Sequence, residues 1–136
     1  MFRNFLPTVV VADPDMFYQQ RIAISLQQGF RCILTGSLRE TYWAILCERP
    51  ALVILELNQP DGDGIALIQH LQADPALKGI LIACVTQRAT IRDKVRAFRA
   101  GADDYIVKPL SSSFFGQMLL LRRAGHMARG YAVAAR

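Results

Sequence analysis

The stretch Gly101-Ala102-Asp103-Asp104-Tyr105-Ile106-Val107-Lys108-Pro109 holds a short apolar run, 105–107, between a glycine and a Lys-Pro pair. Apolar residues bounded in this way indicate a buried β-strand. Upstream, Ile91, Val95 and Phe98 recur at the spacing of one helix face and stop before the glycine, where helices often end. The stretch therefore predicts a helix followed by a buried strand, and we expect the helix to cover a sheet through these three residues.

The same alternation of strand and helix runs through the rest of the chain. Four further apolar runs have strand length and are separated by segments of helix length: 8–12, 32–34, 52–55 and 80–85. This order predicts an α/β fold, a doubly wound, five-stranded parallel sheet of the flavodoxin-like type with helices on both faces. In such sheets, sites lie beyond the carboxyl ends of the strands.

Two other helices have predictable limits. Ser37 and Glu40 form a capping box, which predicts a helix that runs to about residue 47. We expect its inner face to contain five residues: Leu38, Trp43, Ala44, Leu46 and Cys47. Another helix has an apolar face and should end at the Asp74-Pro75 pair: Ile65, Leu67, Ile68 and Leu71.

Composition limits the class of protein. The 136 residues suit one domain, and 52% hydrophobic with 20% charged residues excludes a disordered chain. No apolar run approaches the roughly 20 residues needed to cross a bilayer, and the first residues lack the features of a signal peptide, so we expect a cytoplasmic protein. Cys32, Cys47 and Cys84 lack metal-ligand spacing and are interpreted as reduced packing residues.

The net charge of +5 is concentrated at the end of the chain. Four arginines and no acid lie in residues 122–136, which leaves twelve basic and eleven acidic residues in the rest. We therefore expect a nearly neutral domain over residues 1–123 and a basic tail or linker over residues 124–136.

Polar residues of different chemistry follow four of the predicted strands. Asp13, Glu56, Thr86 and Lys108 each stand at the carboxyl end of a different strand. Because these ends meet at one edge of a parallel sheet, the four side chains are expected to converge in one pocket.

At these residues the chain resembles the receiver domain of two-component response regulators, over about residues 7–123. The resemblance rests on Val9 to Asp13, on Pro50 to Glu56 with Pro60 and Asp63-Gly64, on Val85-Thr86, and on Gly101 to Pro109. It implies the receiver topology, a cis peptide between Lys108 and Pro109, and an aromatic switch position at Tyr105. A fixed packing role for this tyrosine is the alternative.

The chain departs from the receiver pattern at two positions. A typical receiver has a second acid where this chain has Pro14, and a phospho-accepting aspartate where it has Glu56. Mg²⁺ requires near-ideal octahedral oxygen geometry, so we expect no bound metal; the candidate ligands are Asp13, Asp15 and Glu56. We predict a signalling module that is not an enzyme, with little or no phosphorylation at Glu56.

Three alternatives stay open for the pocket. Glu56 either accepts hydrogen bonds from Lys108 and Thr86 as a mimic of the activated state, or merely neutralises Lys108 in a pocket that no longer switches. The third is a working receiver that uses Mg²⁺ and a pocket carboxylate as acceptor. A flavodoxin-like cofactor enzyme is disfavoured, because the acids after the first strand would repel a phosphate.

Two surfaces are candidates for contact with a partner. The helix after Pro109 is apolar around much of its girth, and Phe114, Met118 and Leu120 occupy positions where DNA-binding response regulators pair charges across a dimer. We expect a homodimer or protein partner, such as a histidine kinase or effector domain, on the last helix-strand-helix face. Four arginines are predicted to form a stripe on one helix, yet without aromatic residues they do not predict a nucleic-acid site: Arg88, Arg92, Arg96 and Arg99.

Overall fold

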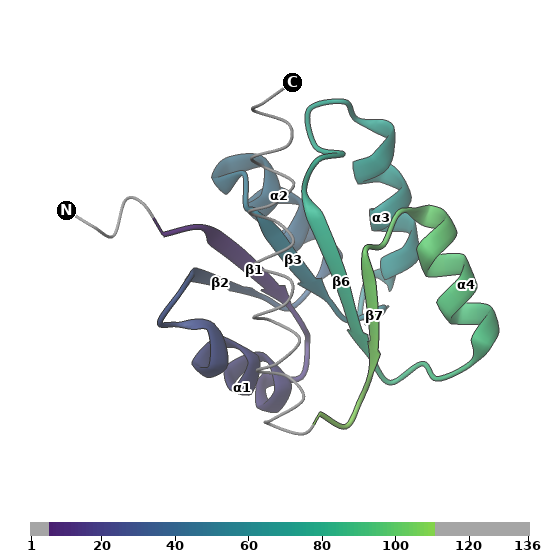
Figure 1. The fold of residues 1–136 in the computed structure, drawn as a ribbon, viewed down its shortest axis with the longest axis horizontal. Coiled ribbons are helices and arrows are strands. Elements are labelled where there is room, and N and C mark those ends of the chain that lie inside the picture. Colours follow the sequence, from purple (N-terminus) through teal and green to yellow (C-terminus); the bar gives the residue numbers. More distant parts are fainter. Residues whose placement is uncertain (1–5, 111–136) are drawn as a thin grey trace.

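A five-stranded parallel sheet forms the centre of the molecule in the computed structural model, which describes residues 6–110 (Figure 1). The strand order is β2-β1-β3-β6-β7, which confirms the predicted doubly wound α/β fold. The strands have these bounds: β1 Thr8–Ala12, β2 Arg31–Thr35, β3 Leu52–Leu55, β6 Leu81–Thr86 and β7 Asp104–Val107. Their limits differ from the predicted ones by one residue where they differ at all. The weakest apolar run became β2, which lies at the edge of the sheet and is only partly buried.

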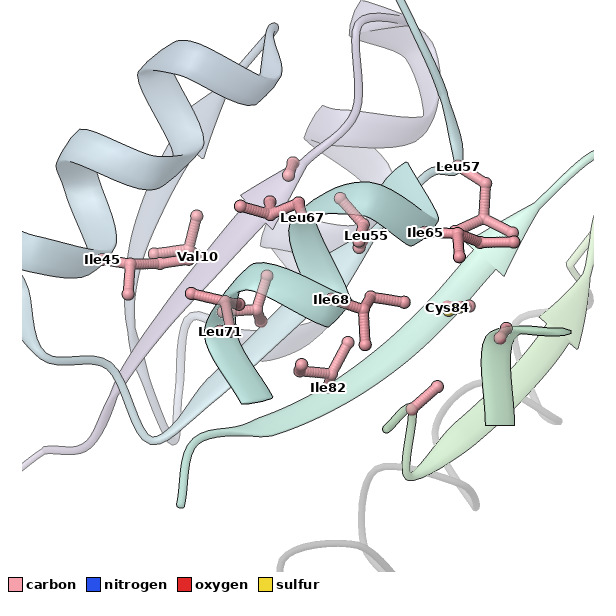
Figure 2. Packing of buried hydrophobic residues seen from close by; sticks show 14 of the residues in the cluster. Val10, Ile45, Leu55, Leu57, Ile65, Leu67, Ile68, Leu71, Ile82 and Cys84 are labelled. Carbon is pink, nitrogen blue, oxygen red and sulfur yellow. The ribbon is translucent and has the colours of Figure 1, made fainter. Parts of the chain in front are cut away.

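Helices cover both faces of this sheet. Their bounds are α1 Met16–Leu26, α2 Leu38–Glu48, α3 Gly64–Ala73 and α4 Ile91–Ala100. One core lies between α1 and the sheet and includes Val9, Val11 and Ile22. The other core lies under α2, α3 and α4; most of its residues are drawn in Figure 2, where Val10 and Ile68 belong to the sheet and to α3. Alternate residues of β1 thus enter opposite cores, as the two-residue repeat of a strand requires.

The helix termini agree closely with the sequence. Ser37 caps α2 by accepting a hydrogen bond from the amide of Glu40 at 3.1 Å, as the capping box predicts. The α3 helix ends at Ala73, before Asp74-Pro75, and α4 ends at Gly101, whose φ of 125° is unfavourable for other residues. None of the helices described is long and apolar enough to span a membrane.

The predicted inner face of α2 was only partly right. Leu38, Ala44 and Leu46 pack against the core as expected. In α2, Trp43 is 57% exposed and Cys47 is exposed, whereas Thr41 and Ile45 face the core. The pattern of apolar residues did not indicate Thr41 as an inner residue, because threonine is polar. Its hydroxyl can be buried here because it is hydrogen-bonded locally: Thr41 Oγ1 lies 2.6 Å from the carbonyl oxygen of Ser37 and 2.7 Å from Thr35 Oγ1. The cysteine is therefore a surface residue instead of a packing residue.

The α4 helix also turns an unexpected side toward the sheet. Ile91, Val95 and Phe98 are 81%, 40% and 41% exposed, and the helix buries only Ala97 among its residues. Periodicity identifies which residues share a face, but it does not decide which face meets the sheet. A small residue at the contact, Ala97, lets α4 approach the sheet closely.

A small antiparallel ribbon after β3 was not predicted. It pairs β4 Asn58–Gln59 with β5 Gly62–Asp63 and carries the chain from the sheet to α3. In the turn of this ribbon, Asp61 accepts hydrogen bonds from the backbone amides of Leu38 and Arg39, so it stabilises the start of α2 from a distant part of the chain.

Candidate functional site

Three of the predicted pocket residues are positioned by backbone hydrogen bonds that continue the sheet past its strands. The amide of Asp13 donates to the carbonyl of Thr35 at 3.0 Å, and the amide of Glu56 donates to the carbonyl of Ala12 at 2.9 Å. The amide of Lys108 donates to the carbonyl of Thr86 at 2.8 Å. The sheet therefore fixes where each of these side chains starts.

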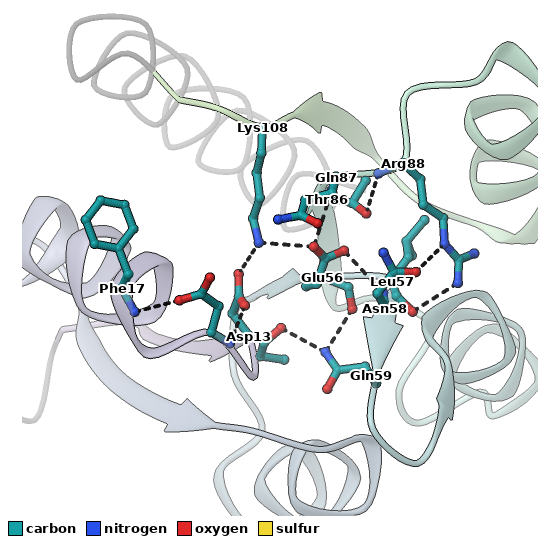
Figure 3. Close-up of polar contacts among 12 residues, drawn as sticks. Asp13, Phe17, Glu56, Leu57, Asn58, Gln59, Thr86, Gln87, Arg88 and Lys108 are labelled. Carbon is teal, nitrogen blue, oxygen red and sulfur yellow. Dashed lines mark hydrogen bonds and ion pairs between the residues drawn. The ribbon is translucent and has the colours of Figure 1, made fainter.

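The side chains meet in a buried ionic triad (Figure 3). Lys108 Nζ lies 2.7 Å from Asp13 Oδ2 and 3.0 Å from Glu56 Oε1. All three side chains are at most 4% exposed. Two carboxylates share one ammonium group, so the triad carries an excess of negative charge when all three groups are ionised.

The carboxylate groups of the triad also accept hydrogen bonds from backbone amides. Glu56 Oε1 and Oε2 each lie 3.2 Å from a backbone amide, of Gln87 and Asn58 respectively. Asp13 Oδ1 accepts from the amide of Asp15 at 2.9 Å. The full set of four carboxylate oxygens is thus engaged by the protein, which lowers the cost of burying two acids.

The electrostatics of the triad follow from burial and from the shared lysine. Burial raises the pKa of Asp13, and the hydrogen bond from Lys108 only partly offsets this. For Lys108, burial lowers the pKa, but the hydrogen bonds and charges of Asp13 and Glu56 outweigh it, so its pKa is raised. The lysine is accordingly the positive centre of the pocket over the physiological pH range.

Tyr18 closes the pocket from α1 and was missed by sequence reasoning. Lys108 Nζ lies 4.1 Å from the centroid of the Tyr18 ring, a cation–π geometry, and the ring packs against the core on that side. The only signal in the sequence was an aromatic residue in the helix that follows Asp13, and this was too common to interpret.

Thr86 differs from one of the expectations made for it, whereas the position of Tyr105 is compatible with both roles considered for it. Thr86 is fully buried, but its Oγ1 accepts from the amide of Arg88 at 3.2 Å, and its bonding partners among the described residues do not include Glu56. The amide of Gln87 takes that place. Tyr105 points inward, 7% exposed, and its hydroxyl donates to the carbonyl of Arg88 at 2.8 Å.

Arg88 is not part of a helical stripe. Because α4 begins only at Ile91, Arg88 lies in the loop after β6 and its side chain crosses to the ribbon. Its Nε donates to Asn58 Oδ1 at 2.7 Å, and a terminal nitrogen lies 3.1 Å from Asp63 Oδ1. The carboxylate of a second acid, Asp93, has its Oδ1 3.8 Å from the same Arg88 nitrogen. We name this group of contacts the Arg88 clamp; neither its acids nor its asparagine were predicted to interact with Arg88.

The family model described as the response regulator receiver domain matches residues 9–119. The chain belongs to this family. Among curated relatives of this receiver domain, the phosphate regulon transcriptional regulatory protein PhoB of Pseudomonas aeruginosa is 29% identical over 87% of the chain and 53% of the relative. The transcriptional regulatory protein PmrA of Pectobacterium parmentieri is 31% identical over 76% of the chain and 46% of the relative.

This receiver domain thus spans about half the length of the curated relatives that it matches. Solved structures show the same fold. A CheY-like response regulator receiver domain protein from Methanospirillum hungatei superposes with a TM-score of 0.83 at 21% identity, covering 91% of this chain and 98% of that chain. The signal receiver domain of a histidine kinase from Syntrophus aciditrophicus gives 0.78 at 25% identity, over 88% and 91%.

The pocket of this receiver domain does not fit the Mg²⁺ ion that the family resemblance implies. Mg²⁺ needs several free oxygen ligands in octahedral geometry, but the Lys108 ammonium stands between the two carboxylates and each of their oxygens already accepts a hydrogen bond. Pro14 offers no side-chain oxygen. Asp15 turns to the amide of Phe17 and caps α1, so it does not complete a site.

The other predicted residues are placed as follows. The peptide between Lys108 and Pro109 is cis. The predicted interface residues Phe114, Met118 and Leu120, and the predicted tail, lie outside the described residues.

Proposed function

We propose that this receiver domain transmits signals in a two-component phosphorelay through protein contacts, with little or no phosphorylation at Glu56. The observation that carries the proposal is the 3.0 Å contact between Lys108 Nζ and Glu56 Oε1 in a buried pocket. The domain would extend over residues 1–123 and act as a binding module, not as an enzyme. Its partner would be a histidine kinase, an effector domain or a second copy of the chain.

The chemistry of phosphoryl transfer supports this proposal. An attacking carboxylate oxygen must be free and in line with the donor, and cationic groups must be free to neutralise the transferred phosphoryl group. Here Glu56 and Lys108 form an ion pair with each other, and Glu56 is one methylene longer than the aspartate of the family pattern. Pro14 removes one of the acids that would recruit a metal.

The contact also supports a role for Glu56 in place of a phosphoryl oxygen. Its carboxylate holds the lysine and the amide of Gln87 from the end of β3, so the pocket is filled without a phosphoryl group. Thr86 Oγ1 accepts a hydrogen bond from the backbone amide of Arg88, so among the described residues the Glu56 carboxylate is held by Lys108 and backbone amides and not by Thr86.

Intact-mass measurement tests the proposal. The wild-type chain, Glu56→Asp, and the double variant Glu56→Asp with Pro14→Asp are incubated with Mg²⁺ and a small-molecule phosphodonor such as acetyl phosphate. We expect no added phosphoryl group on the wild type and one on the double variant. A phosphorylated wild type would contradict the proposal.

A further variant separates the carboxylates of the pocket. Glu56→Gln keeps the shape of the side chain and removes its nucleophile. If the wild type gains a phosphoryl group and Glu56→Gln does not, Glu56 is the acceptor; if both gain one, the acceptor is another carboxylate, and Asp13→Asn identifies it.

A further inference from the structure

A shallow basic groove runs between α3 and α4. It has a volume of about 380 Å³ and is lined by Ile65 and Gln69 from α3 and by Arg96, Arg99 and Ala100 from α4. None of these residues belongs to the Glu56 pocket or to the Arg88 clamp. The volume is within the range of sites for small organic ligands, which is roughly 300–1,000 Å³.

Within residues 6–110, no acid forms an ion pair with the two arginines of the groove. Arg96 and Arg99 are exposed and form no ion pair with any residue in the described part of the chain. The α3 helix contains no acidic residue, and Asp93, the acid of α4, is held by Thr90 and faces Arg88. The groove therefore combines two uncompensated cations with no lining carboxylate.

We propose that this groove binds the phosphate groups of a small phosphorylated ligand of nucleotide size. Arginine guanidinium groups match phosphate oxygens in bidentate geometry, and two of them one helical turn apart can hold one extended phosphate chain. The Gln69 amide supplies a neutral donor and acceptor for the rest of the ligand. Ile65 and Ala100 supply the apolar part of the lining.

The proposal is independent of phosphotransfer at Glu56. The proposed site includes Arg96 and Arg99 but not Arg88, because the Arg88 guanidinium is already paired with Asp63 in the clamp. If the two arginines were merely solvated, they would bind anions weakly and without saturation. Saturable binding that depends on these two residues is what distinguishes a site from a charged surface.

Isothermal titration calorimetry of the full chain in EDTA tests the proposal, with ATP, GTP and inorganic tripolyphosphate as probes. EDTA keeps Mg²⁺ out of the Glu56 pocket. We expect saturable binding of at least one probe, and a rise in Kd of about tenfold or more in Arg96→Gln with Arg99→Gln. Tighter binding of a nucleotide than of tripolyphosphate would support the proposal. Binding of tripolyphosphate as tight as that of the nucleotides would show that only phosphate groups are recognised, and would contradict the roles given to Gln69, Ile65 and Ala100.

Arg39→Gln with Lys78→Gln is the matched control, because it removes the same two charges from exposed positions outside the groove. It should change Kd less than twofold. Circular dichroism of all variants checks that they are folded, which is expected because the substituted side chains are exposed. Absence of saturable binding for every probe, or an equal loss of affinity in the control and in Arg96→Gln with Arg99→Gln, would overturn the proposal.

Discussion

Arg88 Nε donates a hydrogen bond to Asn58 Oδ1 at 2.7 Å and thereby joins the loop after β6 to the ribbon after β3. The two residues flank the carboxylate of Glu56 closely. Asn58 itself donates its backbone amide to that carboxylate, and the residue before Arg88, Gln87, does the same from the other loop. The clamp thus holds in place the two backbone donors that fix Glu56.

Removal of the clamp should loosen both loops. In Arg88→Ala we expect amide hydrogen exchange to accelerate about fivefold in peptides covering residues 57–63 and 86–90, since a partly exposed ion pair of this kind contributes about 1 kcal/mol. Hydrogen exchange with mass spectrometry measures the effect. Arg92→Ala, at an exposed position of α4, is the control, and equal exchange in both variants would show that the clamp has no such role.

Loss of the lysine should be more severe than loss of the clamp. Lys108→Met leaves Asp13 and Glu56 buried without their counter-ion, which we expect to lower the free energy of unfolding by about 3–5 kcal/mol at pH 7. Urea denaturation followed by circular dichroism measures it. Lys94→Met, on the exposed side of α4, should lie within about 0.5 kcal/mol of the wild type. Similar stabilities for the two variants would argue against an ionised triad.

Tyr105 should titrate at unusually high pH. Burial, with a smaller contribution from the charge of Asp93, raises the pKa of its hydroxyl from 10.0 to about 12. Because the folded state retains this proton longer than the unfolded state does, the contribution of Tyr105 to stability is complete below pH 10 and is lost as the pH rises toward 12. The tyrosinate absorbance of the wild type minus that of Tyr105→Phe reports the titration, and a midpoint near pH 10 would contradict a buried hydroxyl.

Gly64 should tolerate no side chain. A Cβ atom at this position would lie 2.9 Å from Leu57 Cα and 3.2 Å from the carbonyl oxygen of Glu56, and backbone atoms cannot move away easily. We expect Gly64→Ala to destabilise the protein by about 1–3 kcal/mol in urea denaturation. Gly79→Ala is the matched control, because nothing lies within 4 Å of its added Cβ. A loss no larger than that of the control would refute the steric argument.

Most of the fold could be predicted because it depends on local patterns. Apolar runs and caps indicated the strands and helix ends, since burial and terminal hydrogen bonds act over a few residues. The inner faces of α2 and α4 could not be derived in the same way. They depend on which side of the helix meets the sheet. In the structure Thr41 and Ala97 are buried there, whereas the larger Trp43 and Phe98 are exposed.

For the site, the sequence likewise predicted which residues come together but not which side chains bind each other. Strand ends indicated Asp13, Glu56 and Lys108, because topology alone brings them to one edge of the sheet. Side-chain partners depend on rotamers and on loop paths. For that reason only the structure showed three contacts: the hydrogen bond from the Arg88 amide to Thr86 Oγ1, the position of the Tyr18 ring over Lys108, and the Arg88 clamp.

The ionic triad also couples the pocket to the order in which the chain is made. Asp13 and Glu56 are synthesised long before Lys108, which is 95 positions from the first acid and 52 from the second. Until the last strand joins the sheet, closing the pocket would bring two uncompensated carboxylates together, and this electrostatic cost opposes premature collapse. A nascent or truncated chain that ends before Lys108 would therefore keep two carboxylates without their counter-ion, which should oppose closure of the pocket.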